Sequence, residues 1–229
     1  MTGIALNLQA VGARIAAAAA RSGRRASDVA LLAVSKTFPP SYIEDAFSAG
    51  QRAFGESYAQ EGVKKITVLS HLPLEWHFIG PIQSNKTRVI AEHYRWVHGI
   101  DRERIAARLA AARPAHLPPL HVCIQVNVSG EASKSGVSPG EELPLANAIA
   151  RLPQLRLRGL MTIPEPTENT ALQHRRYALL RELKDRLAAA GHPVDTLSMG
   201  MSDDFESAIE EGATIVRVGS AIFGSRERL

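Results

Sequence analysis

The chain has 229 residues, of which 45% are hydrophobic and 22% charged, and its net charge is +4. A globular chain of this length buries about 70–75% of its unfolded surface, so it requires neither a disulfide nor a structural metal. The lone cysteine, Cys123, lies in an apolar run and is expected to be a small buried side chain. The basic residues are mixed with acidic ones and not interleaved with aromatic ones, which argues against nucleic-acid binding.

Nothing in the sequence is typical of export or membrane insertion. No charged-then-apolar leader opens the chain, and no run reaches the ~18 apolar residues of a membrane span. The alanine tract at residues 16–20 is flanked by Arg14 and Arg21, which suits a helix better than a signal peptide. We therefore expect a cytoplasmic protein.

Short apolar runs typical of β-strands alternate along the chain with stretches of helical pattern, and a further helix is expected near residues 4–22. The runs cover residues 29–35, 52–55, 75–79, 95–99, 120–128, 157–163, 195–199 and 215–218. Parallel strands need crossover connections, so this alternation predicts a parallel sheet. Eight units favour closure into a (β/α)8 TIM-type barrel, with residues 1–229 as one domain.

Polar and otherwise unusual residues follow nearly every candidate strand, where (β/α)8 barrels carry their functional sites. Lys36 stands out because it ends an apolar run. An amine at an apolar barrel mouth is desolvated, which lowers its pKa and leaves more of the neutral form that attacks aldehydes. The plainer interpretation is a lysine that reaches past the strand end into solvent.

Two turns could cradle a phosphate. Residues 198–204 contain Gly200 and Ser202, whose hydroxyl could bind an anion or cap the following helix. Residues 219–224 repeat the pattern with Gly219 and Ser220. The loops after strands seven and eight frequently form the phosphate site of such barrels, so the two turns support each other.

Arg217 lies within the apolar eighth run. A guanidinium is costly to bury without a partner, so Arg217 either pairs with a carboxylate such as Glu206 or Glu210, or contacts a ligand. A pyridine nitrogen that faced Arg217 could take no proton from it, and an unprotonated ring is a poorer electron sink.

Other residues are less specific. The loop 80–86 could contact a ligand or cap the next helix, and Lys134 in the Gly/Ser-rich segment 129–136 could be a second amine or a plain loop lysine. His77 is most simply interpreted as a strand residue whose ring nitrogens have hydrogen-bond partners. No cluster of Cys, His and carboxylate residues has the spacing of metal ligands.

Taken together, these segments resemble the pyridoxal phosphate homeostasis protein family, the YggS/PROSC-type proteins that bind pyridoxal 5'-phosphate (PLP). The resemblance covers nearly the whole chain. It is carried by residues 33–37, 54–56, 77–86, 133–136, 159–161, 197–203 and 216–224.

The resemblance implies a barrel like the N-terminal domain of alanine racemase, with PLP held as a Schiff base on Lys36 and its pyridine nitrogen facing Arg217. It implies a phosphate site around Ser202, Gly219 and Ser220. The remaining expected cofactor-binding residues are Ser35, Asn127, Met161 and Met199, with Lys134, Ser57 and His77 as auxiliary residues.

Two positions depart from the pattern of the family, whose members often carry a lysine at the position of Phe38 and an asparagine at that of Ser57. The first departure removes a second lysine close to Lys36 and leaves Lys134 as the auxiliary amine. The second weakens the amide contact to the cofactor that the resemblance implies.

We expect a monomeric carrier or buffer of PLP that maintains vitamin B6 homeostasis and delivers PLP to apo-enzymes, and not an enzyme. The chain ends soon after the eighth unit, so we expect no added C-terminal β domain of the kind that completes a racemase. The alternatives are a PLP-dependent racemase or decarboxylase completed by a partner chain, a cofactor-free Schiff-base aldolase, and a nucleic-acid-binding protein.

Overall fold

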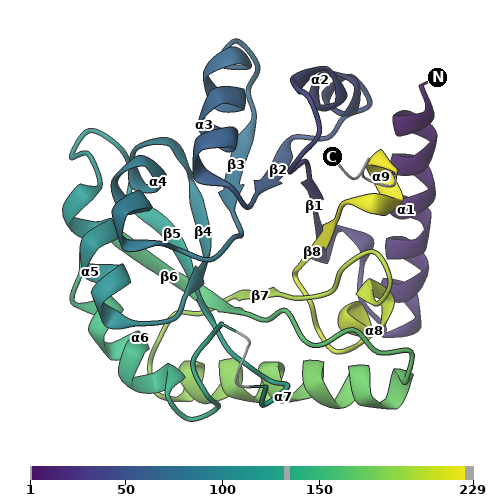
Figure 1. Ribbon diagram of the computed structural model, residues 1–229. Coiled ribbons are helices and arrows are strands. Elements are labelled where there is room, and N and C mark those ends of the chain that lie inside the picture. Colours follow the sequence, from purple (N-terminus) through teal and green to yellow (C-terminus); the bar gives the residue numbers. More distant parts are fainter. Residues whose placement is uncertain (1, 132–134, 225–229) are drawn as a thin grey trace.

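The computed structural model describes residues 2–131 and 135–224, and its eight strands close into a parallel barrel (Figure 1). Each strand pairs with the next in sequence, and β8 pairs back with β1 to close the ring. The strands are β1 (Ala30–Val34), β2 (Ala53–Glu56), β3 (Glu75–Phe78), β4 (Trp96–Ile100), β5 (Leu120–Gln125), β6 (Leu155–Met161), β7 (Thr196–Ser198) and β8 (Ile215–Val218). The predicted barrel is confirmed, and each predicted strand overlaps one observed strand.

Helices surround the barrel on its outer side (Figure 1). The α-helices are α1 (Gly3–Arg21), α2 (Pro40–Ser48), α3 (Ala59–Val68), α4 (Thr87–His93), α5 (Glu103–Ala112), α6 (Glu142–Ala150), α7 (Thr170–Ala189), α8 (Phe205–Glu210) and α9 (Ser220–Phe223). Two short 3-10 helices are η1 (Ala26–Asp28) and η2 (Ser84–Lys86). The predicted N-terminal helix is α1.

The fifth strand ends three residues earlier than its apolar run. After Gln125 the chain pairs with its own loop, because Asn127 N–H donates to the carbonyl of Val137 and Val137 N–H donates to the carbonyl of Gln125. Val126 is buried and its N–H still donates to the carbonyl of Met161 in β6, whereas Val128 lies beyond the strand and is only partly buried.

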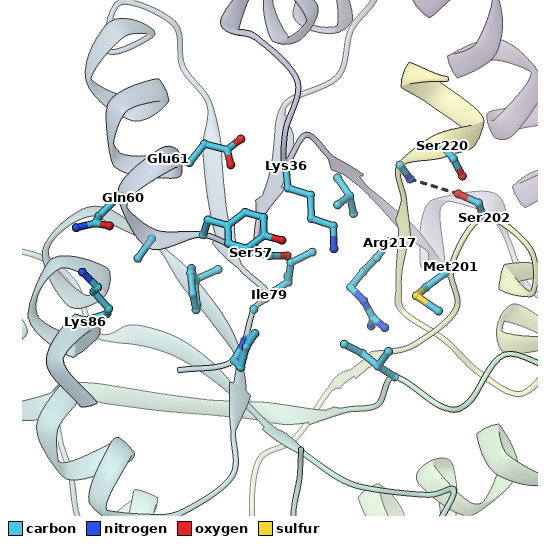
Figure 2. Close-up of a pocket in the computed structure, with 18 of the residues that line it drawn as sticks. Lys36, Ser57, Gln60, Glu61, Ile79, Lys86, Met201, Ser202, Arg217 and Ser220 are labelled. Carbon is cyan, nitrogen blue, oxygen red and sulfur yellow. Dashed lines mark hydrogen bonds between the residues drawn. The ribbon is translucent and has the colours of Figure 1, made fainter. Parts of the chain in front are cut away.

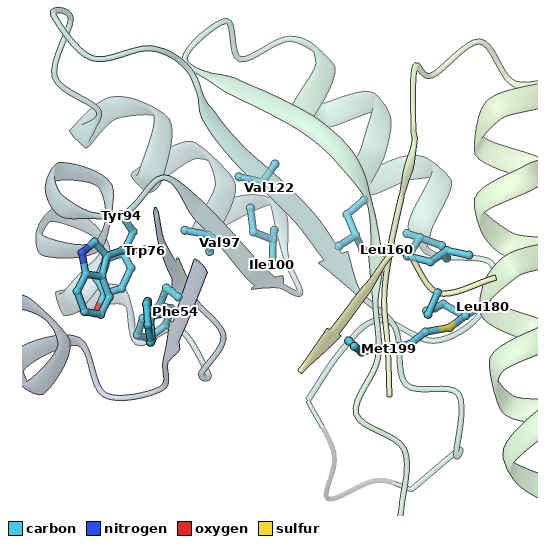
Figure 3. Packing of buried hydrophobic residues seen from close by; sticks show 14 of the residues in the cluster. Phe54, Trp76, Tyr94, Val97, Ile100, Val122, Leu160, Leu180 and Met199 are labelled. Atoms are coloured by element: carbon cyan, nitrogen blue, oxygen red, sulfur yellow. The ribbon is translucent and has the colours of Figure 1, made fainter. Parts of the chain in front are cut away.

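Side chains on the two faces of the strands form two cores, and they alternate along the strands except at irregularities in β4 and β6, where Val97 and Ile100, and likewise Leu157 and Leu160, lie in the same core. Outward-facing side chains pack under the helices, and Figure 3 shows two parts of this core, one around Phe54 and Trp76 and another where Leu160 and Met199 meet Leu180 of α7. Inward-facing side chains make two small apolar clusters inside the barrel. Outside these irregularities, period-2 alternation decides which residues of a strand face the barrel interior.

The N-terminal helix α1 is long and apolar enough, by length and composition, to cross a membrane. In the structure it packs against α8, α9 and α2, with Val11 and Ile15 buried. Arg14 and Arg21 form ion pairs with Glu206 and Glu210 of α8, at 2.6 and 2.7 Å. These contacts are those of a helix that covers a core.

Candidate cofactor site

A pocket of about 800 Å³ opens at the carboxyl ends of the strands. Six of the residues singled out from the sequence line it: Lys36, Ser57, Ser202, Arg217, Gly219 and Ser220. Figure 2 shows the Lys36 side chain near the middle, with Ser202, Ser220 and Arg217 on one side and Gln60 and Lys86 on the other. Folding thus brings together residues from the first, second, seventh and eighth units.

The backbone on both sides of Lys36 is held by α3. Lys65 Nζ donates to the carbonyl oxygen of Ser35 at 2.7 Å, and Thr37 N–H donates to Glu61 Oε1 at 2.6 Å. Thr37 has a φ of 70°, a left-handed conformation that is uncommon for a residue other than glycine. These bonds keep the chain in this turn and direct the half-buried Lys36 side chain into the pocket.

Beneath this turn lies a buried ionic network. Lys65 Nζ donates to Glu56 Oε1 at 2.8 Å and to Glu61 Oε1 at 2.6 Å, and Ser35 Oγ donates to Glu56 Oε1 at 2.7 Å. Burial raises the pKa of Glu56, although the positive charge of Lys65 opposes this shift. Ser35 therefore turns its side chain to this network and does not line the pocket.

Arg217 lines the pocket although it is only 3% exposed. Its Nη1 donates to Ser198 Oγ at 2.8 Å and its Nη2 donates to the Thr162 carbonyl at 2.7 Å. Burial lowers the pKa of the guanidinium. The alternative of a pairing with Glu206 or Glu210 is wrong, because those carboxylates bind the arginines of α1.

The two candidate phosphate turns meet at Ser202. Its Oγ accepts long hydrogen bonds from the N–H groups of Gly219 at 3.4 Å and Ala221 at 3.5 Å, and Figure 2 marks one hydrogen bond to Ser202 with a dashed line. The expected capping of the following helix by Ser202 is wrong, since the N-cap of α8 is Asp204. The Ser202 hydroxyl is instead directed to the turn after β8.

Gly200 serves packing more than access to an anion. Its φ is +90°, and an added Cβ would lie 2.6 Å from the Cβ of Ala208 and 2.9 Å from the Cα of Phe205. A side chain at this position would collide with α8. The glycine therefore lets the loop after β7 lie directly on that helix.

Of the residues predicted to bind the cofactor or to assist, five do not line the pocket: Ser35, His77, Asn127, Met161 and Met199. Met199 is buried in the core under the helices and Met161 in the barrel interior. Asn127 holds its own loop, because its Oδ1 accepts from the N–H groups of Ser129 and Gly130 at 3.3 and 3.2 Å. His77 lies deeper in the barrel, bonded to Glu75 and His98. Lys134 lies outside the described residues.

Several lining residues were not singled out from the sequence. Val34, Ile79 and Ile163 give the pocket apolar walls, and Met201 lies beside Ser202 of the candidate phosphate turn. The loop 80–86 does reach the pocket, through Gly80, Pro81, Gln83 and Lys86. The loop could therefore reach a ligand in this pocket, and that contact stays a prediction.

The two departures from the family pattern lie near the Lys36 turn. Ser57 lines the pocket. Phe38 stacks on Tyr42 with ring centroids 5.5 Å apart and contacts Phe223 of α9 at 5.2 Å. At this position the chain has an aromatic contact between the loop after β1 and the last helix, in place of a second amine.

Histidines in the barrel make the stability dependent on pH. Burial lowers the pKa of His77 and His98, and lowers that of His121 to about 4. In the unfolded chain, these histidines take up protons below their ordinary pKa of about 6.5. In the folded chain, they stay neutral to lower pH. The contribution of these three neutral histidines to the free energy of unfolding is therefore fully present above pH 6.5 and declines as the pH falls toward 4.

We expect the free energy of unfolding to fall from pH 7 to pH 5 in urea titrations. His121 contributes roughly 1 kcal/mol of this loss after allowance for its partial exposure, and the two buried histidines add to it. His121→Asn should flatten the curve, with the exposed His71→Asn as the matched control. A curve equally steep in His121→Asn would contradict the assignment.

The donor set fits PLP. Lys36 supplies an amine, Arg217 a guanidinium, and the turn at Ser202 a hydroxyl beside backbone N–H groups, all around a pocket with apolar walls. An amine, a guanidinium and these donors suit a planar anion that carries a phosphate at one end and an electrophile at the other. The size of the pocket is that of a small-molecule site.

Comparison with known proteins places these features in a family. The profile of the alanine racemase N-terminal domain matches residues 6–227. The pyridoxal phosphate homeostasis protein of Pseudomonas aeruginosa is 60% identical over 99% of this chain and 97% of its own length. That of Escherichia coli is 54% identical over 99% of this chain and 98% of its own length.

Solved structures agree. PipY of Synechococcus elongatus, whose structure has PLP bound, superposes with a TM-score of 0.84 and 34% identity, over 96% of this chain and all of PipY. The alanine racemase of Corynebacterium glutamicum shares the fold, with a TM-score of 0.72 and 17% identity over 96% of this chain and 62% of the racemase. The chain belongs to the pyridoxal phosphate homeostasis protein family, and its barrel is an alanine racemase N-terminal domain.

Proposed function

We propose that this protein binds PLP on Lys36 and thereby maintains the supply of the cofactor. One observation carries the proposal: the Lys36 amine and the Arg217 guanidinium line one pocket with the Ser202 turn, in a chain whose relatives are PLP homeostasis proteins along their full length. Bound PLP supplies an aldehyde that condenses with an amine and a ring that can withdraw electrons.

Each residue of the pocket has a separate task in this proposal. Lys36 supplies the amine, and the bonds from α3 to Ser35 and Thr37 hold its backbone. Ser202, Gly219 and Ser220 bind the phosphate through hydroxyl and N–H donors. Ser57 and Ile79 lie beside the Lys36 side chain, where a bound ring would lie (Figure 2).

The position of Arg217 favours a protein that holds the cofactor over an enzyme that uses it to convert amino acids. A guanidinium only donates hydrogen bonds and keeps its proton, so a ring nitrogen facing it accepts a hydrogen bond and stays unprotonated. Such a ring withdraws electrons weakly, which disfavours bond breaking at an attached amino acid. We infer a carrier or buffer in the cytoplasm that acts as a monomer and passes PLP to apo-enzymes.

The visible absorption spectrum of the purified protein, with and without added PLP, tests the binding site. We expect a yellow band in the parent protein and in Lys64→Ala, and no such band in Lys36→Ala, because only Lys36 of these two lysines lines the pocket. Lys64 is the matched control, an exposed lysine on α3. A parent that stays colourless with PLP would refute the proposal, and an aldolase that uses Lys36 without a cofactor would then be favoured.

Turnover is tested separately with the PLP-loaded protein and purified amino acids. The carrier proposal predicts no loss of optical activity and no release of carbon dioxide above the rate of free PLP. Substantial racemisation or decarboxylation that disappears in Lys36→Ala would replace the carrier proposal with an enzyme.

A further inference from the structure

A continuous row of polar side chains fills part of the barrel interior. His77 alternates with the outward-facing Trp76 and Phe78 on β3, and Ser198 follows the outward-facing Leu197 on β7. His98 of β4 and Arg217 of β8 lie on the same inner side, and all four polar residues are at most 3% exposed. Polar groups buried this deeply must satisfy one another.

Four hydrogen bonds join these residues in one chain. Starting at the pocket, Arg217 Nη1 lies 2.8 Å from Ser198 Oγ, and Ser198 Oγ lies 2.8 Å from His98 Nδ1. His98 Nε2 then lies 2.9 Å from His77 Nδ1, and His77 Nε2 lies 3.0 Å from Glu75 Oε1. The other oxygen of Glu75 is paired with Arg95 Nε at 3.0 Å.

The two ends of the chain lie at opposite ends of the barrel. Arg217 lines the pocket that contains Lys36. Glu75 and His77 line a separate hollow of about 350 Å³ with Trp96, Thr196 and other residues that begin their strands. The row of hydrogen bonds therefore connects the amino-terminal end of the barrel to the cofactor pocket.

The end groups fix the direction of every bond. A guanidinium only donates and a carboxylate only accepts, so Ser198 accepts from Arg217 and has its own hydroxyl proton left to donate to His98 Nδ1. His98 must then carry its proton on Nε2 and donate to His77 Nδ1. His77 likewise carries its proton on Nε2 and donates to Glu75. Both rings are neutral, in agreement with their lowered pKa values.

The opposite direction of hydrogen bonding leaves groups at both ends of the row without a suitable partner. If His98 carried its proton on Nδ1, His77 would have to donate from its own Nδ1, and its bare Nε2 would face the Glu75 carboxylate at 3.0 Å. The Ser198 hydroxyl would also accept two bonds, and among the described residues no other acceptor is bonded to it. Two facing acceptors repel, so only one arrangement of protons satisfies the chain.

We propose that Glu75, His77, His98 and Ser198 are positioning residues that hold the Arg217 guanidinium in the orientation required at the cofactor ring. The chain ties Arg217 to a carboxylate that is itself anchored at the far end of the barrel, so the guanidinium cannot rotate without breaking the row. This role rests on the proposed function in that Arg217 faces bound PLP; the proton arrangement does not.

The proton arrangement is tested in the parent apoprotein, so it depends on no substitution and no cofactor. Long-range proton–nitrogen NMR of protein labelled with ¹⁵N-histidine at pH 7.5 distinguishes the two neutral tautomers and the charged ring. We expect both His77 and His98 as the neutral form protonated at Nε2. If either ring is protonated at Nδ1 or is charged, the proposed direction of the hydrogen bonds is wrong.

The positioning role is tested with Ser198→Ala, which removes the link next to Arg217. Thr196→Val is the matched control, since it removes a hydroxyl two residues away on β7 that donates to Asp195 and takes no part in the chain. We expect Ser198→Ala to weaken PLP binding about tenfold and to shift the His98 Nδ1 resonance. Thr196→Val should do neither.

Three results separate the claims. Equal PLP affinities in Ser198→Ala and Thr196→Val, both folded by circular dichroism, would overturn the positioning role. A parent that binds no PLP would overturn the proposed function and the positioning role with it. The tautomers of His77 and His98 in the apoprotein test the hydrogen-bonded row independently of whether the protein binds PLP.

Discussion

Lys65→Met is expected to lower the free energy of unfolding by about 3–5 kcal/mol, because removal of one partner from a buried ion pair leaves an uncompensated charge. Lys65 is 5% exposed and Glu56 fully buried, and the second oxygen of Glu56 has no hydrogen-bond partner among the described residues. Without Lys65, the Glu56 carboxylate would keep only the hydroxyl of Ser35. Urea denaturation measured by circular dichroism gives the change.

Two variants make the reason for that loss testable. Lys64→Met changes the neighbouring exposed lysine of the same helix and should stay within about 0.5 kcal/mol of the parent. The double variant Lys65→Met, Glu56→Gln removes both charges and should recover part of the loss. A double variant less stable than Lys65→Met would show that the stranded carboxylate is not the cause.

Gly159→Ala is expected to cost about 4 kcal/mol or more, or to prevent folding. Gly159 pairs with Thr196 where β6 meets β7, and an added Cβ would lie 1.9 Å from the Thr196 carbonyl oxygen and 2.8 Å from its carbon. Backbone atoms of a central strand cannot move aside without opening the barrel ladder. A glycine is therefore required at position 159 because β6 and β7 approach each other closely there.

Thermal unfolding of the purified variant, or its yield in the soluble fraction, measures this effect. Gly12→Ala is the control, since Gly12 is exposed on α1 and an added Cβ would meet nothing within 4 Å. Alanine in that helix should be neutral or stabilising by up to about 1 kcal/mol. A Gly159→Ala protein as stable as the parent would refute the steric argument.

The sequence predicted the strands better than the directions of their side chains. Apolar runs between helical patterns were sufficient to identify eight strands. The position of Lys36 at the end of an apolar run was sufficient to single it out, and it lines the pocket. Met199 also follows a strand, but it lies in the core under the helices while Ser198 faces the barrel interior. One residue of register decides between the two, and strand boundaries from sequence are less precise than that.

The residues that hold the site were harder to predict than those that line it. Lys65 lies on an amphipathic helix beside Lys64, and helical spacing does not show which of two adjacent lysines turns inward. Its partner Glu61 lies one turn earlier, a spacing equally common on exposed helix faces. The bond from Lys65 to the Ser35 carbonyl joins two elements 30 residues apart, and only the tertiary structure shows it.

The seam between β1 and β8 has a consequence for how the protein is made. Lys36 follows the first strand and Arg217 lies in the last, and Leu32 pairs with Arg217 across the seam. A nascent chain on the ribosome has the lysine long before it has the arginine and the turn at Ser220. Cofactor capture in the proposed site would therefore be a late event of biogenesis, and PLP would stabilise only chains whose barrel has closed.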